Sequence, residues 1–337
     1  MTTSLVPPGP GGAHAQAPEA LARAGALVVP ALLAAVERLD ASLHAPVHHH
    51  LAAGGKHVRA ALVLLASTAV GGRHEDAVPG AVAIELVHNY SLLHDDIIDG
   101  DRERRHRPAV WAQFGEGVAI VAGDALAALA MQVLLDPPTE PRVHAARRLA
   151  DANQAMISGQ SADMAFEARG RVTVAECLAM ERGKTGALLS ASCAIGALLG
   201  GADARTADVL GEYGEHLGIA FQAVDDVLGV WGETSVTGKP VGADLLARKK
   251  TLPVAVAFEQ GGELADELSA ILTGTPDPGD VARATELMDR AGVREEVTAI
   301  ADEHLRAALG SLDRAPIATS PKQELCEVAR YVTARDR

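Results

Sequence analysis

Apolar residues recur at the spacing of an α-helix from about Leu21 almost to the end of the 337-residue chain. Examples are the segments ALLAAVERL (31–39), AVAIELVHNYSLL (81–93) and AIVAGDALAALAMQVLL (119–135). No alternating strand pattern competes with them, and no repeat of about 20–50 residues is present. Aromatic residues make up only 3% of the chain, which also favours helices over sheets. The sequence therefore predicts an all-α protein in which residues 21–337 form one domain, a single large helical bundle.

Other features of the sequence limit the compartment and the partners expected of such a protein. Residues 1–20 are rich in Pro, Gly and Ala and are predicted to be a flexible tail, without the features of a signal peptide. The longest uncharged run, residues 186–202, is shorter than the roughly 20 residues of a membrane span, so we expect a core helix there. Three cysteines without paired spacing, Cys177, Cys193 and Cys326, are typical of the reducing cytoplasm. The net charge of −14 argues against general binding to nucleic acid.

An acidic segment, SLLHDDIIDGDRERRHRP (91–108), follows one of the apolar helical patterns. On a helix, Asp95 and Asp99 would lie on one face, one turn apart, with Asp96 beside them. Like charges this close destabilise each other. Mg²⁺ removes that cost, because it prefers oxygen ligands and is held by carboxylates together with substrate phosphates. Taken alone, the motif favours a solvated acidic turn over a metal site.

A second acidic segment changes that balance. The sequence GIAFQAVDDVLGVWG (218–232) places Asp225 and Asp226 inside another apolar helical run, where a solvated surface is difficult to reconcile with the pattern. Buried carboxylates need a partner charge. Two such segments, facing each other across a bundle, could hold a cluster of metal ions between them.

Basic residues gather close to glycine pairs or to these carboxylates. They are Lys56 and Arg59 in AAGGKHVRA, Arg104 and Arg105 in RERRHRP, Lys184 in KTG, and Lys239, Lys249 and Lys250 in TGKPVGADLLARKKTLP. Arginine suits phosphate oxygens through two parallel hydrogen bonds, and lysine acts as a point charge. Each residue alone could be an ordinary surface charge. Together they indicate two phosphate sites, one that works through metal and one that binds directly.

These motifs carry a resemblance to a known family. GGKHVR, HNYSLLHDDIID, RRHRP, AGDAL, GQSAD, KTGALL, FQAVDD, TGKPVGADL and KKTLP stand in the order found in trans-isoprenyl diphosphate synthases, the polyprenyl synthetase family. Over roughly residues 50–255 the chain resembles the short-chain geranylgeranyl and farnesyl diphosphate synthases of actinobacteria. The resemblance implies an all-α bundle around a central apolar cavity, usually as a homodimer. It also implies that the chain condenses an allylic diphosphate with isopentenyl diphosphate, head to tail.

The resemblance also implies roles for individual residues. Asp95 and Asp99 would hold two Mg²⁺ ions on the allylic diphosphate and Asp225 a third, with Asp96 and Asp226 in support. The residues expected to grip the allylic diphosphate directly are Arg104, Lys184 and Lys239. Those expected to bind the metal-free isopentenyl diphosphate are Lys56, Arg59, His88 and Arg105. Gln222 and the carbonyls near Lys184 and Thr185 would face the allylic cation.

The resemblance also predicts the length of the product, and two positions depart from the family pattern. In this family the growing chain runs along the helix of the first motif, so Val87, Tyr90 and Ser91 are expected to form its floor. The bulky Tyr90 predicts geranylgeranyl diphosphate, with farnesyl diphosphate next. Gly229 stands where the family more often has a third acidic residue, and we expect activity to survive this change. His106 replaces a common glycine after the arginine pair.

Three alternatives remain open from the sequence. A class I terpene cyclase would use the same fold and metal site but would not need a second phosphate site. A non-catalytic regulatory subunit of a prenyl synthase would be expected to have a degraded first motif, which is intact here. Finally, residues 1–20 resemble the tails of some actinobacterial relatives packaged in protein shells, so a shell protein is a possible partner.

Overall fold

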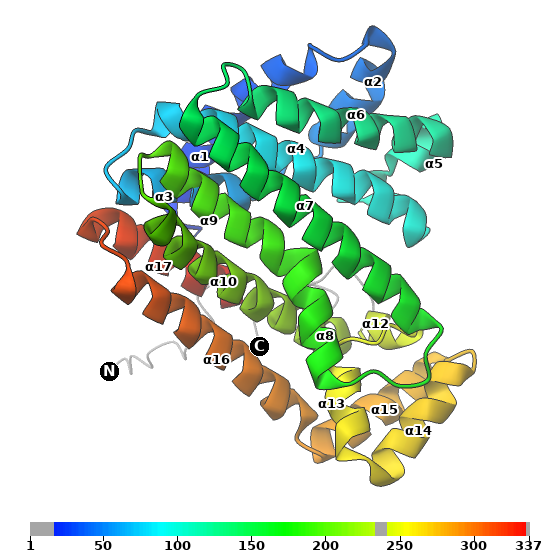
Figure 1. The fold of residues 1–337 in the computed structure, drawn as a ribbon. Helices are drawn as coiled ribbons and strands as arrows, with labels where there is room; N and C mark the ends of the chain where they lie inside the picture. Colours follow the sequence, from blue (N-terminus) through cyan, green and yellow to red (C-terminus); the bar gives the residue numbers. More distant parts are fainter. Residues whose placement is uncertain (1–16, 233–240, 335–337) are drawn as a thin grey trace, which may run out of the picture.

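The computed structural model describes residues 17–232 and 241–334, and these form helices joined mostly by short turns (Figure 1). The helices are α1 (Glu19–Val36), α2 (Ala41–Leu51), α3 (Val58–Ala69), α4 (His74–Ile98), α5 (Val110–Phe114), α6 (Glu116–Leu134), α7 (Glu140–Glu167), α8 (Val174–Glu181), the π-helix η1 (Arg182–Gly186), α9 (Ala187–Leu199), α10 (Ala204–Trp231), α12 (Ala243–Leu246), α13 (Leu252–Gln260), α14 (Gly262–Thr273), α15 (Pro278–Arg290), α16 (Val293–Arg314) and α17 (Thr319–Thr333). Two short strands, β1 (Glu103–Arg104) and β2 (Arg107–Pro108), pair antiparallel. The prediction of an all-α bundle is confirmed.

The long helices lie side by side. In Figure 1, α4, α6, α7, α9, α10 and α16 run in one general direction across the molecule, and α12 to α15 form a smaller group at one end. Helix α10 packs between α9 and α16, while α4 packs against α3 and α6. The carboxyl end of α4 and the carboxyl half of α10, which carry the two acidic segments, both lie away from the α17 end of the bundle.

Small residues allow the central helices to approach closely. A Cβ placed on Gly196 of α9 would overlap the carbonyl oxygen of Val63 on α3, and one on Gly214 of α10 would lie 2.9 Å from Ser190 Cα on α9. Helix α9 is correspondingly almost enclosed, with Cys193 and Ile195 fully buried. The expectation of a core helix within residues 186–202 is therefore confirmed.

Buried side chains form two apolar clusters. One is built mainly on α1, α3, α4, α6, α7, α9, α17 and the first half of α10, and the other on the second half of α10 with α12 to α15. Helix α16 contributes to both clusters. Helix α10 contributes Leu217 to the first cluster and Ala223 to the second. The border between the clusters therefore falls beside the second acidic segment, where polar groups can be held between two packed cores.

The structure describes only the last part of the predicted N-terminal tail. Helix α1 begins at Glu19, directly after Pro18, so the last residues of the predicted tail are helical. Residues 1–16 lie outside the described residues, so the tail and its shell partner stay predictions. By length and composition α1 and α6 could cross a bilayer, which is weak evidence because core helices pass the same test. In this structure 39% of each of these two segments is buried within the bundle.

Candidate active site

The first acidic segment stands at the carboxyl end of α4. Asp96 is only 1% exposed and accepts a hydrogen bond of 2.6 Å from Nε of Arg104. Burial raises the pKa of Asp95, Lys184 opposes that shift, and the neighbouring Asp99 adds to it. The carboxyl end of a helix is also its negative pole, which disfavours further negative charge there. A fully solvated acidic turn does not fit the burial of Asp96, although Asp99 is exposed.

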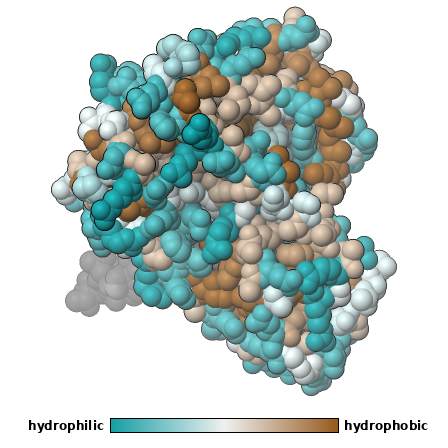
Figure 2. All heavy atoms as spheres, in the orientation of Figure 1, coloured by the Kyte–Doolittle hydropathy of each residue, from teal (hydrophilic) through white to brown (hydrophobic). Residues whose placement is uncertain are grey.

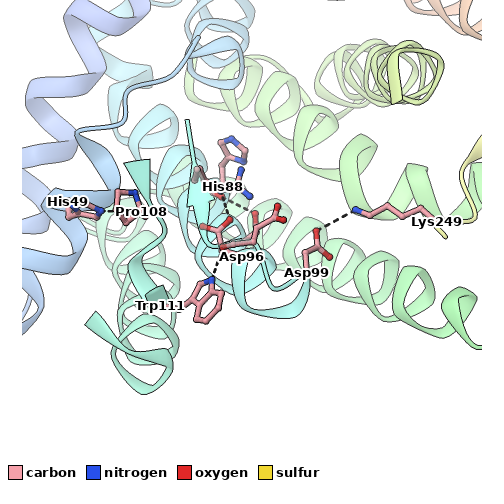
Figure 3. Close-up of polar contacts among 10 residues, drawn as sticks. His49, His88, Asp96, Asp99, Pro108, Trp111 and Lys249 are labelled. Carbon is pink, nitrogen blue, oxygen red and sulfur yellow. Dashed lines mark hydrogen bonds and ion pairs between the residues drawn. The ribbon is translucent and has the colours of Figure 1, made fainter. Parts of the chain in front are cut away.

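A hairpin directs the arginine pair that follows. Arg105 and His106, the two residues between β1 and β2, have φ of 52° and 61°, which matches the two positive values of a type I′ turn. His106 thus adopts the left-handed conformation that the more common glycine would adopt freely. Trp111 Nε1 donates to the Asp101 carbonyl oxygen at 2.8 Å and anchors the base of the loop (Figure 3).

The two arginines serve different sides of this hairpin. Arg104 reaches back to Asp96 on α4. Arg105 lies over the glycine pair before α3, because a Cβ placed on Gly55 would come within 3.3 Å of its Nη1. One short hairpin therefore gives two adjacent cations different partners, although both arginines line the cavity described below.

The second acidic segment is built into α10. Asp226 is 4% exposed, and its two oxygens accept hydrogen bonds of 2.9 Å from Gln222 Nε2 and from the backbone N–H of Leu252. Burial raises the pKa of Asp226 to about 7, and the charge of Asp244 adds to that shift. Asp226 is therefore a fixed supporting group, whereas Asp225 lines the large cavity described below.

Two further groups lie behind Asp226. Ligand atoms of Cys177, Glu181 and Asp226 lie within 4.8 Å of one another, and all three residues are buried. Burial raises the pKa of Glu181 well above its ordinary value, and the charge of Asp226 adds to the shift. Its surroundings therefore favour the protonated form of Glu181. Neither residue was predicted, since the helical pattern alone does not show what lies behind α10.

Two lysines pair with carboxylates near the acidic segments. Lys184 Nζ lies 2.5 Å from Asp163 Oδ2 on α7, and Lys249 Nζ lies 3.5 Å from Asp99 Oδ2, a contact visible in Figure 3. Burial lowers the pKa of Lys249, but Asp99, Asp244 and Asp163 together raise it above the ordinary value. The negative charges of three carboxylates from different parts of the chain thus act on one ammonium group, and Asp99 contacts it directly.

Two other lysines were named as basic residues near the site, Lys250 and Lys239. Lys250 is buried and its Nζ donates to the Arg248 carbonyl oxygen at 3.2 Å, so it takes no part in these ion pairs. Lys239 lies outside the described residues.

The turn that carries Lys184 and Thr185 is a π-helix, η1. Such turns are rare in proteins, and those that occur are frequently found at functional sites. Gly159 of the GQSAD motif makes room for it, because a Cβ there would overlap the Lys184 amide nitrogen. Thr185 Oγ1 donates to Gln222 Oε1 at 3.0 Å, which connects this turn to α10. The oxygens of Thr185 and Gln222 are thereby held in one place.

One cavity at the site is rich in cations. A cavity of about 950 Å³ is lined by the predicted residues Lys56, Arg59, His88, Arg104, Arg105 and Asp225, among others. Arg59 Nη1 lies 3.4 Å from His88 Nε2, and burial, followed by the charges of Arg59 and Arg105, lowers the pKa of His88 well below its usual value. His88 is therefore a neutral hydrogen-bonding group among cations.

One buried carboxylate opposes these cations. Glu85 is 6% exposed, accepts a hydrogen bond of 3.3 Å from the amide of Ala60, and lies 3.8 Å from His57 Nδ1. The sequence did carry a signal for it, because a glutamate one turn before His88 interrupts a face that is otherwise apolar. The pocket keeps a net positive charge, which suits an anion.

The predicted floor residues alternate along α4 with residues that line this cavity but do not line it themselves. Val87 is buried, and Ser91 Oγ donates to the His88 carbonyl oxygen of its own helix at 2.9 Å. The hydroxyl of Tyr90 donates to Oδ1 of Asn153 on α7. Asn153 was not predicted.

Comparisons with known proteins identify the family of this chain. The family model described as "Polyprenyl synthetase" matches residues 40–288. A (2E,6E)-farnesyl diphosphate synthase of Mycobacterium tuberculosis is 43% identical over 92% of this chain and 90% of its own length. A geranylgeranyl diphosphate synthase of the same species is 43% identical over 91% and 92%. The crystal structure of a polyprenyl synthetase from Streptomyces coelicolor A3(2) superposes with a TM-score of 0.89 at 44% identity, over 93% of this chain and 98% of that one. The chain therefore belongs to the polyprenyl synthetase family and is a trans-isoprenyl diphosphate synthase, a prenyltransferase.

Proposed function

We propose that this prenyltransferase condenses an allylic diphosphate with isopentenyl diphosphate head to tail, depends on Mg²⁺, and makes mainly geranylgeranyl diphosphate, with farnesyl diphosphate as the next candidate. The observation that carries the proposal is that the two adjacent arginines of the hairpin have different partners. Arg104 lies beside the carboxylate of Asp96, and Arg105 lies over Gly55 in the cationic pocket. Two diphosphates, one bound through metal and one bound directly, would then meet at the cavity that Arg104, Arg105 and Asp225 line.

The carboxylates fit Mg²⁺ in number and in kind. Asp95 and Asp99 bring like charges together, and Asp96 Oδ2 is buried without a hydrogen-bond partner. A donor set made of oxygens suits Mg²⁺ better than softer metals. We infer three ions, two held by Asp95 and Asp99 and one by Asp225, with Asp226 behind. When bound, these ions neutralise the charge of the allylic diphosphate and make it a better leaving group.

The protein's own cations support the same departure. Arg104 and Lys184 would grip the leaving pyrophosphate together with Lys239, because positive charge there stabilises the charge that develops as the C–O bond breaks. Both described cations are held in position by carboxylates, Arg104 by Asp96 and Lys184 by Asp163. Pairing of this kind reduces the reorganisation needed when the substrate binds.

The remaining steps concern the allylic cation. The oxygens of Thr185 and Gln222, fixed by their mutual hydrogen bond, would face the cation with the negative ends of their dipoles. The double bond of isopentenyl diphosphate then attacks the cation, and the adduct loses a proton to form the new double bond. The released pyrophosphate would accept that proton. Lys56, Arg59, His88 and Arg105 would hold the second diphosphate throughout.

An exposed apolar surface supports a homodimer. On α6 and α7, which lie side by side in Figure 1, Ile120 and Val121 are 45% and 53% exposed and Ile157 and Met164 are 48% and 49% exposed. Figure 2, drawn from the same side, shows hydrophobic residues gathered over the part of the molecule where these helices lie. A second copy that covered this surface would remove it from water. The unpaired cysteines support a cytoplasmic location.

The test is an assay with isopentenyl diphosphate and each of the C5, C10 and C15 allylic diphosphates, with and without Mg²⁺, followed by product sizing. Condensation that stops when Mg²⁺ is chelated, with C20 as the main product, supports the proposal. Release of a hydrocarbon from one allylic diphosphate alone would instead identify a terpene cyclase. Activity that appears only after a second prenyl synthase is added would identify a regulatory subunit.

A further inference from the structure

Asp244 belongs to neither acidic motif, yet its carboxylate lies at the second one. Gly229 stands four residues after Asp225 on α10, so the two share a helix face. A Cβ placed on Gly229 would overlap Asp244 Oδ2 and would lie 2.6 Å from Asp244 Cγ. The carboxylate of Asp244 therefore fills the space that a side chain at position 229 would need. This is the place at which the family more often has a third acidic residue.

The backbone around Asp244 holds it in this position. Gly242 has a φ of 70°, which favours glycine, and turns the chain into the single turn of α12. The next residue, Leu245, is fully buried in the second apolar cluster. The amide of Lys249 donates to the Asp244 carbonyl oxygen at 2.9 Å and closes the turn. Asp244 is thus fixed at α10 by the packing of its neighbours.

Geometry places Asp244 on the face of α10 that carries the second acidic segment. Its carboxylate lies against Gly229, and Gly229 and Asp225 are one helical turn apart. Five residues after Asp244, the ammonium group of Lys249 lies 3.5 Å from Asp99 of the first acidic segment. The short segment that carries Asp244 therefore reaches both acidic segments.

We propose that Asp244 supplies the third carboxylate of the second acidic motif and, with Asp225, receives a divalent ion on the α10 side of the site. Gly229 is then glycine because the carboxylate enters from α12 and leaves no room for a side chain on α10. The inference rests on the Mg²⁺-dependent condensation proposed above. It explains how a motif without its usual last acid keeps the same number of oxygen donors.

The experiment measures binding of inorganic pyrophosphate by calorimetry over a range of Mg²⁺ concentrations. The slope of the logarithm of the binding constant against that of the Mg²⁺ concentration counts the ions taken up. For Asp244→Asn and Asp244→Ala we expect the slope to fall by about one ion, and the Mg²⁺ needed for half-maximal condensation to rise roughly tenfold or more. Asp244→Asn keeps the size of the side chain, and the melting temperature without Mg²⁺ shows whether the substitution destabilises the fold.

Two control variants separate a metal role from other roles. Lys249→Met removes the cation beside Asp244 but leaves the carboxylate, so the slope should stay at the wild-type value. Asp266→Ala removes a carboxylate whose side chain is 83% exposed on α14, and nothing should change. If Lys249→Met lowers the slope as much as Asp244→Asn, Asp244 acts only by positioning Lys249 and the proposal is overturned.

A swap tests the relation between the two positions. Gly229→Asp alone should impair Mg²⁺-dependent binding, because two carboxylates would compete for one space. The double variant Gly229→Asp/Asp244→Ala should recover much of what Asp244→Ala loses, and a double variant no better than Asp244→Ala overturns the proposal. Loss of condensation in the wild-type chain would overturn the proposed function instead. Wild-type condensation together with an unchanged slope in Asp244→Asn would overturn this inference alone.

Discussion

The phenol oxygen of Tyr90 on α4 donates a hydrogen bond to Asn153 Oδ1 on α7 and so joins two helices across the bundle. Tyr90 is only 7% exposed, and its ring meets that of His94 edge-on with centroids 5.6 Å apart. His94 is itself packed on α6, since a Cβ placed on Gly123 would overlap its imidazole. A prenyl chain growing along α4 from Asp95 would therefore meet a ring that is held on two sides.

Both partners of this hydrogen bond should control product length. Tyr90→Ala should make products longer than C20 the main ones, because the ring is gone. Asn153→Ala should lengthen the products less, because the hydrogen bond contributes only about 1 kcal/mol and the ring remains. Product sizing at a fixed ratio of the two substrates checks this. Ser158→Ala, further along α7, is the control and should leave the profile unchanged, whereas an unchanged profile in Tyr90→Ala would refute the floor.

Glu85 should matter for isopentenyl diphosphate and little for the allylic substrate. Glu85→Ala removes the acceptor of the Ala60 amide and a buried counter-charge to Arg59, so α3 should lose its alignment with the pocket. We expect KM for isopentenyl diphosphate to rise about tenfold or more, from the cost of leaving buried polar groups unpaired. Steady-state kinetics with each substrate varied in turn checks this. The exposed Glu75→Ala on the same helix serves as the control, and an equal rise in both KM values would count against the assignment.

Asp96 should act through Arg104. Asp96→Ala frees Arg104 and leaves its charge without the partner that orients it, so kcat should fall roughly 10²-fold with a small change in KM for isopentenyl diphosphate. Asp96→Asn keeps the shape and a hydrogen-bond acceptor and should lose less. Measuring kcat and KM separately distinguishes a loss of Arg104 orientation from general destabilisation of the fold. General destabilisation would lower the melting temperature and change the KM for both substrates.

Glu181 predicts a pH dependence of stability. Its pKa is raised above the ordinary value in the folded protein, so folding takes up a proton, and stability present below about pH 4.5 is lost as the pH rises. Glu181→Gln cannot ionise. It should therefore gain stability relative to the wild type as the pH rises from about 5 to 8. Urea unfolding across that pH range measures the difference, and a difference that does not grow with pH would contradict the raised pKa of Glu181.

The apolar surface on α6 and α7 should control the oligomeric state. Val121→Lys places a charge at the centre of the proposed contact and should convert a dimer into a monomer, because burying an unpaired charge is costly. Light scattering on a sizing column measures the mass. Leu27→Lys, at an equally apolar exposed position on α1, should leave the dimer intact. If both variants behave alike, the contact surface lies elsewhere.

Much of the fold could be predicted from local pattern. Helical periodicity in segments such as 81–93 and 119–135 corresponds to α4 and α6, because the spacing of apolar residues is set by which face of a helix is buried. The same spacing placed Asp95 and Asp99 one turn apart on α4, and the apolar run around Asp226 indicated its burial. The hairpin after α4 was harder to predict, since His106 adopts a left-handed conformation that a glycine would have signalled.

The sequence by itself determined which side chains share a helix face, and thereby the acidic and basic motifs and the helical class of the protein. Only the tertiary structure decided which faces meet. Tyr90 and Asn153 are 63 residues apart, and Asp244 reaches the space above Gly229 from a different helix. Spacing along a chain is set by the geometry of one helix, whereas contacts between helices depend on how all their surfaces pack at once.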